Sequence, residues 1–264
     1  MMWLCSFALQ AQLSPKREFR GAWIQCVNYQ FMGLGTAEMQ RTLTYQLNEL
    51  QKCGINAILF QVRPEFDALY ASSFEPWSRY LTGQQGTPPS PYWDPLQWMI
   101  AQCHARGMEL HAWINPYRCQ TAGQMLKIPD TYPTRMWAQE QAEPIVQVSG
   151  RWYLNPADAH AQALICTGAQ ELLDGYDIAG LHIDDYFYPT TEPEMDAAAF
   201  AASRSEDLTA WRTEQVNTLV AALYAQAHAA DRIFSISPRG DPAASAQLLY
   251  ADPVSIVQRH CGKV

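Results

Sequence analysis

Residues 180–189 read Gly-Leu-His-Ile-Asp-Asp-Tyr-Phe-Tyr-Pro. The apolar first half has the length and composition of a buried strand, and the acidic pair Asp184-Asp185 follows it directly. Side chains alternate along a strand, so Asp184 shares a face with His182 and Asp185 shares a face with Ile183. The stretch therefore predicts a buried parallel strand that ends in a polar site, with Asp184 and His182 facing that site together.

Four further strand-like runs share this short apolar character: 19–26, 55–62, 108–115 and 233–237. Helical patterns separate the five runs, which predicts βα units and a parallel sheet. The links from helix to strand are short, whereas the links 63–93 and 116–156 that follow strands are long. Long loops after the strands are typical of an active site in a TIM (β/α)8 barrel. A doubly wound sheet is the alternative, but no glycine-rich phosphate loop follows the first strand.

The composition restricts the class of protein. The chain has 264 residues and a formal net charge of -8, which argues against binding to nucleic acid or to an anionic membrane surface. Aromatic residues make up 12% of the chain and suit sugar rings as well as a core. The seven cysteines include no CxxC pair, so a zinc knuckle is not predicted. We expect neither a metal nor a cofactor.

The N-terminal residues 1–16 contain a short apolar run that lacks a positively charged start. We expect either the remnant of a secretory signal or a disordered N-terminus there, and one barrel domain over 17–264. No apolar run approaches the roughly 20 residues that a membrane span needs. An exported protein, periplasmic, secreted or attached at most peripherally to the cell envelope, is the resulting expectation.

Polar residues follow each predicted strand, and a pocket with charged groups and aromatic walls is expected where they meet. The catalytic candidates are the carboxylates that glycoside hydrolysis would need: Asp184, Asp185 and Glu65. The alternative is structural: one aspartate caps the loop while the other pairs with an arginine, and Glu65 pairs with Arg63 or Arg118.

Substrate contacts are expected from residues beside these carboxylates and in the loop after the second strand. The candidates are Arg63, Glu75, Trp77, Arg79, Tyr80, His111, Trp113, Asn115, Tyr117, His182, Tyr186 and Tyr188. His111 and His182 could bind a metal with Asp184, but the HxH and HExxH spacings are absent. Hydrogen-bonded wall residues are the favoured reading of both histidines.

Several long motifs together resemble one family. They are 19–23, 60–70, 75–83, 111–118 and 180–189, and the similarity extends over about residues 17–260. The chain is similar to the glycosyl hydrolase-like 10 family, which includes bacterial envelope proteins. The resemblance implies a TIM barrel that acts on glycans, with cell-wall (peptidoglycan) glycan strands as the substrate and export from the cytoplasm.

The α-amylase-like barrels offer a looser analogy for the roles of the carboxylates. They carry a nucleophilic Asp on the fourth strand in a Gly-x-x-x-Asp run, and Gly180 and Asp184 fit that spacing. They carry the acid, a Glu, on the fifth strand, where this chain has Ser237-Pro238-Arg239. The analogy therefore leaves the partner of Asp184 open.

The family resemblance also implies further strands after residues 250–253. We therefore expect about five βα units, a barrel truncated at its C-terminal side. Three functions follow: a glycan hydrolase, a non-catalytic glycan-binding or degenerate barrel, and a metal-dependent amidase or deacetylase. A glycan is the expected partner in the first two, and no oligomeric state is predicted.

Overall fold

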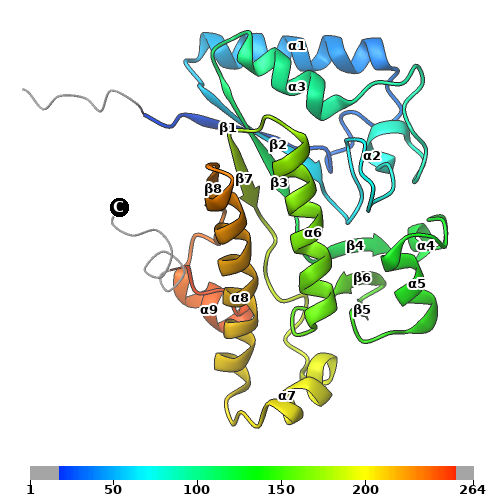
Figure 1. Ribbon diagram of the computed structural model, residues 1–264, viewed down its shortest axis with the longest axis vertical. Coiled ribbons are helices and arrows are strands. Elements are labelled where there is room, and N and C mark those ends of the chain that lie inside the picture. Colours follow the sequence, from blue (N-terminus) through cyan, green and yellow to red (C-terminus); the bar gives the residue numbers. More distant parts are fainter. Residues whose placement is uncertain (1–17, 254–264) are drawn as a thin grey trace, which may run out of the picture.

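The computed structural model describes residues 18–253, and its centre is a five-stranded parallel sheet (Figure 1). The strands are β1 (Gly21–Ile24), β2 (Ala57–Arg63), β3 (Glu109–Ile114), β7 (Gly180–Ile183) and β8 (Ile233–Ile236). They lie in the order β1-β2-β3-β7-β8, so each parallel strand pairs with its predecessor in the chain. A doubly wound sheet reverses its strand order, whereas a TIM barrel does not. All five predicted strands are present, and the alternative fold is excluded. The expectation for residues 1–16 lies outside the described residues.

Four long helices connect these strands and cover one face of the sheet. They are α1 (Thr36–Lys52), α3 (Pro95–His104), α6 (Ala159–Gly175) and α8 (Leu208–Ala229). The apolar stripe Met39, Leu43 and Leu47 is buried along α1, as its spacing predicts. Asp94 and Asp158 accept hydrogen bonds from the first-turn amides of α3 and α6, which fixes where these helices begin.

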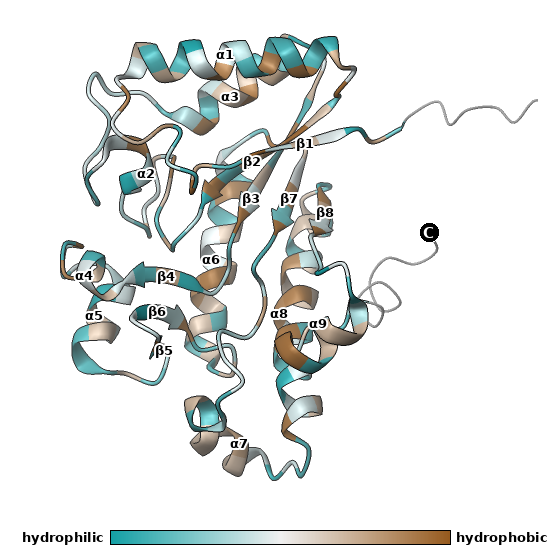
Figure 2. Cartoon of the chain, turned by 180° about the vertical axis from the view of Figure 1, so that it is seen from behind, coloured by the Kyte–Doolittle hydropathy of each residue, from teal (hydrophilic) through white to brown (hydrophobic). Residues whose placement is uncertain are grey.

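The loops that follow the strands carry all the remaining elements. They are α2 (Arg79–Thr82), β4 (Arg118–Thr121), α4 (Ala122–Met125), α5 (Pro133–Glu140), β5 (Ile145–Val148), β6 (Arg151–Leu154), η1 (Pro193–Asp196), α7 (Ala197–Ser203) and α9 (Pro242–Leu249). Strands β4, β6 and β5 form a second, antiparallel sheet within the long loop after β3. Figure 2 shows β4 and β6 as largely hydrophilic. The sequence did not predict this small sheet, because its strands have only four residues each.

The register of the large sheet sorts side chains onto two faces. His111, Trp113, His182 and Ser235 lie on the face away from the helices, since Trp113 pairs with His182 and His182 with Ser235. Gly180 makes this packing possible: a Cβ there would lie 2.4 Å from Nδ1 of His111 and 2.7 Å from the carbonyl oxygen of Ile233. The sheet can therefore accept His111 only because residue 180 has no side chain.

We predict that Gly180→Ala lowers the free energy of unfolding by about 1–3 kcal/mol, because the methyl group forces His111 and the backbone of β8 apart. Chemical denaturation followed by far-ultraviolet circular dichroism measures the change. Gly175→Ala is the matched control, since a Cβ at Gly175 meets nothing within 4 Å. Equal midpoints for the two variants would contradict the packing argument.

Candidate active site

A chain of hydrogen bonds joins the C-terminal ends of four neighbouring strands. Oε1 of Gln61 accepts from the backbone N–H of Cys26 at 3.0 Å, and Nε2 of Gln61 lies 3.5 Å from Oδ1 of Asn115. Nδ2 of Asn115 donates to Oδ2 of Asp185 at 3.2 Å. Residues that follow β1, β3 and β7 are thereby joined through Gln61 of β2. We call this group at the strand ends, around Gln61, Asn115 and Asp185, the strand-end centre.

The two aspartates have different surroundings, although they are adjacent in the chain. Asp185 forms an ion pair with Arg118 and accepts the hydrogen bond from Asn115. Oδ1 of Asp184 accepts from the backbone N–H of Asp185 at 2.7 Å, and within residues 18–253 no side chain forms a hydrogen bond with Asp184. Burial raises the pKa of Asp184, and the charge of Arg118 opposes that rise. Asp184 is therefore the carboxylate more easily kept protonated.

The backbone explains why both carboxylates lie at the strand ends. Strand β7 ends at Ile183, and Asp185 has a φ of 49°, in the left-handed region. Strict alternation would place Asp184 and Asp185 on opposite faces, but the turn at Asp185 ends the alternation. The Arg118 and Asn115 contacts hold this uncommon conformation.

His182 is uncharged and lies on the face of the large sheet away from the helices. Nε1–H of Trp23 donates to Nε2 of His182 at 3.4 Å, and the hydroxyls of Ser235 and Ser237 lie 2.8 Å from Nδ1 and 3.0 Å from Nε2. Because indole is only a donor, Nε2 is the acceptor and Nδ1 carries the proton. Burial and the neighbouring His111 lower the pKa of His182 to about 4. Within residues 18–253 the two histidines gather no third metal-binding side chain.

His182 should make stability depend on pH. In the unfolded chain a histidine binds a proton below about pH 6.5, whereas folded His182 resists protonation down to about pH 4. The unfolded state therefore binds more protons in this window, and the free energy of unfolding falls as pH drops from 6.5 to 4, by on the order of 3 kcal/mol. Denaturation at several pH values should show this slope, weakened in His182→Gln and kept in the exposed control His160→Gln. A full slope in His182→Gln would refute the assignment.

Glu65, predicted as a catalytic carboxylate, is sequestered instead. It is 1% exposed, and its two oxygens contact Nη1 of Arg151 at 2.5 Å, Nη2 of Arg79 at 3.1 Å and the hydroxyl of Tyr80 at 3.1 Å. A salt bridge was the stated alternative, but its partners are Arg79 and Arg151 rather than Arg63 or Arg118. With both oxygens engaged, Glu65 is placed to orient the arginines and not to reach a sugar.

Arg63 and Glu75, predicted to contact substrate, lie on the opposite side of the sheet. Each side chain is 0% exposed, and the two form an ion pair. The register of β2 against β3 shifts between Gln61 and Arg63, so this bulge turns Arg63 to the helix-covered face. Gly168 of α6 leaves the space, since a Cβ there would lie 2.6 Å from Nη1 of Arg63.

A structural role for this pair predicts a loss of stability. Glu75→Gln should lower the free energy of unfolding by about 3–5 kcal/mol, because the guanidinium of Arg63 stays buried without its counter-charge. The control Glu49→Gln removes a carboxylate from an exposed pair with Lys52 and should cost less than about 1 kcal/mol. Denaturation midpoints compare the two variants. If Glu75→Gln lowers the free energy of unfolding no more than the control does, the structural role is wrong and the substrate-binding interpretation is restored.

Other predicted contacts divide into residues near the centre and residues far from it. Trp113 lies 6.3 Å from the ring of His182, whereas His111 is buried against Phe19. Tyr117 is also buried, and its pKa is raised by burial and by Cys166 of α6. Trp77 meets Tyr92 at 6.1 Å in the loop after β2.

The two tyrosines after the acidic pair, Tyr186 and Tyr188, are buried. Tyr186 is 0% exposed and packs on Phe187 with ring centroids 4.8 Å apart. Tyr188 packs on Tyr250 and under the guanidinium of Arg212, which in turn forms a buried ion pair with Asp196. This cluster anchors the loop after β7. Burial and then the charge of Asp184 raise the pKa of Tyr186, so the hydroxyl of Tyr186 lies near that carboxylate.

The sequence did not predict two residues of the centre, Arg151 and Tyr29. Arg151 lies 86 positions from Glu65, so no local pattern links them. Tyr29 is 53% exposed and its ring lies 5.3 Å from that of Tyr80. Its position after β1 is the signal that could have identified it.

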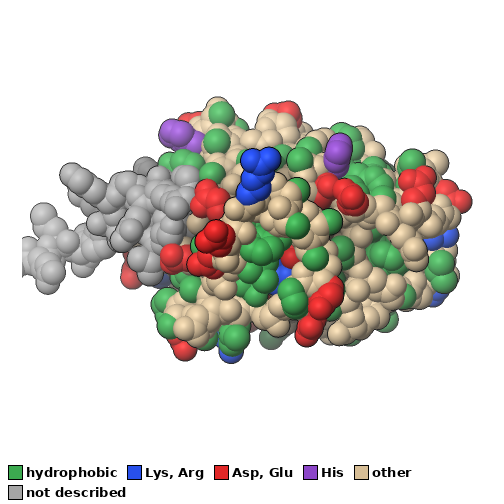
Figure 3. All heavy atoms as spheres, turned by 90° about the horizontal axis from the view of Figure 1, so that it is seen from below, with side chains coloured by type: hydrophobic (Ala, Val, Ile, Leu, Met, Phe, Trp, Pro, Cys, Tyr) green, Lys and Arg blue, Asp and Glu red, His purple; other side chains and the backbone are tan. Residues whose placement is uncertain are grey.

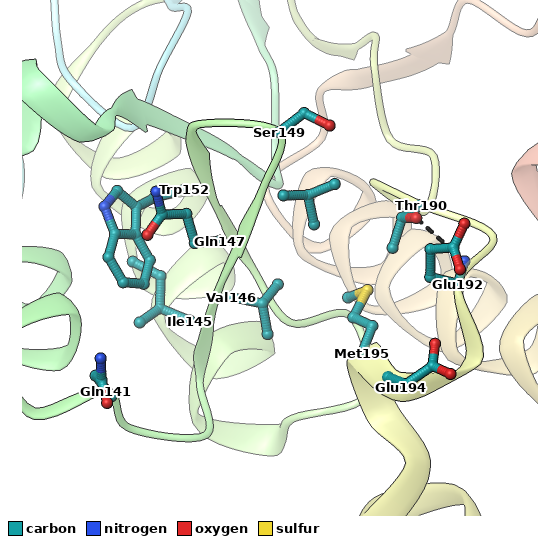
Figure 4. Close-up of a pocket in the computed structure, with 11 residues that line it drawn as sticks. Gln141, Ile145, Val146, Gln147, Ser149, Trp152, Thr190, Glu192, Glu194 and Met195 are labelled. Atoms are coloured by element: carbon teal, nitrogen blue, oxygen red, sulfur yellow. Dashed lines mark hydrogen bonds between the residues drawn. The ribbon is translucent and has the colours of Figure 1, made fainter.

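A cavity of about 610 Å³ lies beside the small sheet, between the β5–β6 hairpin and residues 190–195. In Figure 4, Val146 and Met195 point towards one another across it, while Glu192 and Glu194 stand on the side opposite the hairpin. Figure 3 shows acidic side chains around hydrophobic ones on the face seen from below. The cavity thus has an apolar interior and an acidic edge.

The family model described as Glycosyl hydrolase-like 10 matches residues 18–261. The chain belongs to this family. Among its relatives, glycosyl hydrolase YngK of Bacillus subtilis is 34% identical over 251 residues, 89% of this chain and 48% of YngK. Glycosyl hydrolase DigH of Escherichia coli K12 is 36% identical over 156 residues, 56% of this chain and 35% of DigH. This member of the family thus spans about half the length of YngK, and its match to DigH covers about a third of that protein.

Solved structures support the same fold. The glycoside hydrolase domain of PgaB (BpsB) from Bordetella bronchiseptica aligns with a TM-score of 0.64 at 13% identity, over 92% of this chain and 72% of that domain. Alpha-L-fucosidase isoenzyme 2 from Paenibacillus thiaminolyticus aligns with a TM-score of 0.61 at 12% identity, over 87% of this chain and 34% of the fucosidase. The family member therefore has the α/β barrel class of these hydrolases. None of its helices within residues 18–253 is long and apolar enough to cross a membrane.

Proposed function

We propose that this chain is a glycoside hydrolase domain that acts on bacterial cell-wall glycan strands, outside the cytoplasm, and that Asp184 is its principal catalytic carboxylate. The observation that carries the proposal is the contrast between the two adjacent aspartates. Burial raises the pKa of Asp184, whereas Asp185 forms an ion pair with Arg118. Glycoside hydrolysis needs one carboxyl group to supply a proton and one negative charge beside the sugar.

In the proposed reaction, Asp184 donates its proton to the glycosidic oxygen as the bond from that oxygen to the anomeric carbon breaks. Positive charge develops on the sugar ring in the transition state. The Asp185 carboxylate, fixed by Arg118 and Asn115, stabilises that charge from a position set before the substrate binds. Water then adds to the anomeric carbon and its proton returns to the carboxylate of Asp184.

A glycan-binding domain without turnover is the second candidate. The observation that favours it is Glu65, which is fully engaged by Arg79 and Arg151 and so does not supply a second free carboxylate. Sugar binding with no new reducing ends would support this function over hydrolysis.

The proposal predicts that Asp184→Asn lowers kcat/KM on peptide-free peptidoglycan glycan strands by about 10²-fold or more, because the amide cannot donate the proton. Release of reducing ends measures the rate, and unchanged circular dichroism excludes unfolding. Asp174→Asn, at the far end of α6, is the control and should retain activity. Asp184→Asn and Asp185→Asn that both cleave at the native rate would sink the hydrolase assignment.

A further inference from the structure

Three arginines reach the strand-end centre from three separate elements. Arg79 belongs to α2, Arg118 to β4 and Arg151 to β6. Arg79 and Arg151 share the single carboxylate of Glu65, and Arg118 pairs with Asp185. Three guanidinium charges are thus paired with two carboxylates.

Arg118 and Arg151 lie close to one another. They come from paired strands, since Arg118 is opposite Tyr153 of β6 and Thr121 is opposite Arg151. The pKa of Arg118 is lowered by burial and next by the charge of Arg151. Two neighbouring guanidiniums repel one another, and an anion bound between them relieves that repulsion.

Both guanidiniums keep donors for a ligand. Arg118 is 28% exposed and Arg151 25% exposed in their side chains. Arg118 uses Nη2 for Asp185, and Arg151 uses Nη1 for Glu65 and for the carbonyl of Cys119. Their other nitrogens form no hydrogen bond within residues 18–253. Because a guanidinium has five N–H groups, each arginine can still bind a carboxylate.

The rest of the molecule makes such a site specific. The chain carries a net charge of -8. An anionic polymer therefore gains little from the general field of this protein and would bind only where positive charge is concentrated.

We propose that Arg118 and Arg151 form a carboxylate-binding subsite, which selects a glycan whose sugar beside the scissile bond carries a carboxyl substituent. This inference rests on the proposed function, because it assigns the substrate class to the same site. Arg79 stays on Glu65, and Glu65 holds Arg151 in place for the ligand. A neutral polysaccharide of similar backbone lacks the group that the two arginines recognise.

The test compares two substrates that differ only in charge. One is peptide-free peptidoglycan glycan with free carboxylates, and the other is the same glycan after its carboxylates have been coupled to methylamine. We expect wild-type kcat/KM to be on the order of tenfold higher for the charged glycan, the size of one charge-assisted contact. In Arg151→Gln the ratio should fall towards one, and in Arg151→Lys it should be partly kept.

Arg232→Gln is the matched control, because Arg232 pairs with Asp177 near the opposite end of β8, before the strand begins. It should keep the wild-type ratio. Equal cleavage of both glycans by the wild type, or a full preference in folded Arg151→Gln, would overturn the carboxylate subsite and leave the hydrolase assignment intact. If Arg151→Gln does not fold, the ratio in Arg151→Lys decides, and an unchanged ratio there overturns the subsite.

Binding separates this inference from the proposed function. Titration calorimetry with Asp184→Asn measures affinity for both glycans without turnover. Tighter binding of the charged glycan supports the subsite even if the wild type cleaves neither glycan. A wild type that cleaves neither glycan would overturn the hydrolase assignment but not the subsite. Equal affinities, or no binding of either glycan, overturn the subsite.

Discussion

The candidate site depends on the ion pair between Asp185 and Arg118. Asp185 has a left-handed backbone, and Arg118 begins the small antiparallel sheet. The pair therefore joins the end of β7 to β4 across 67 residues of chain. Strand β4 pairs with β6, and Arg151 of β6 reaches Glu65 in the loop after β2. One carboxylate–guanidinium contact thus belongs to a continuous polar connection between three βα loops.

Carboxylates near the strand ends have different roles, depending on whether an arginine is paired with them. Glu65 and Glu75 are both carboxylates in the loop after β2, and both are buried against arginines. A buried ion pair adds little net stability, but a buried charge that loses its partner is strongly destabilising. Each partner must therefore stay in place. Asp184 differs because no arginine within residues 18–253 is paired with it, so its protonation can change without breaking an ion pair there. This is why it, and not Glu65, is the residue argued to act chemically.

The sequence predicts the parts of the fold that local periodicity determines. The stripe of Met39, Leu43 and Leu47 and the apolar run before Asp184 identified a helix and a strand at the observed places. Arg63 was misplaced because a bulge after Gln61 moves it to the other face, and a bulge leaves no mark in the alternation itself. Arg151 was missed because its partner lies in another loop. Contacts between distant loops depend on packing, which a single sequence does not encode locally.

The acid role of Asp184 and the carboxylate subsite would reinforce one another. Burial raises the pKa of Asp184, and the charge of Arg118 opposes part of that rise. An anionic group of the substrate bound to Arg118 and Arg151 would offset part of that positive field. The bound substrate would then raise the pKa of Asp184 further. Binding of the substrate's carboxylate and the rise in the pKa of Asp184 would thus both act through Arg118, the arginine that also orients Asp185.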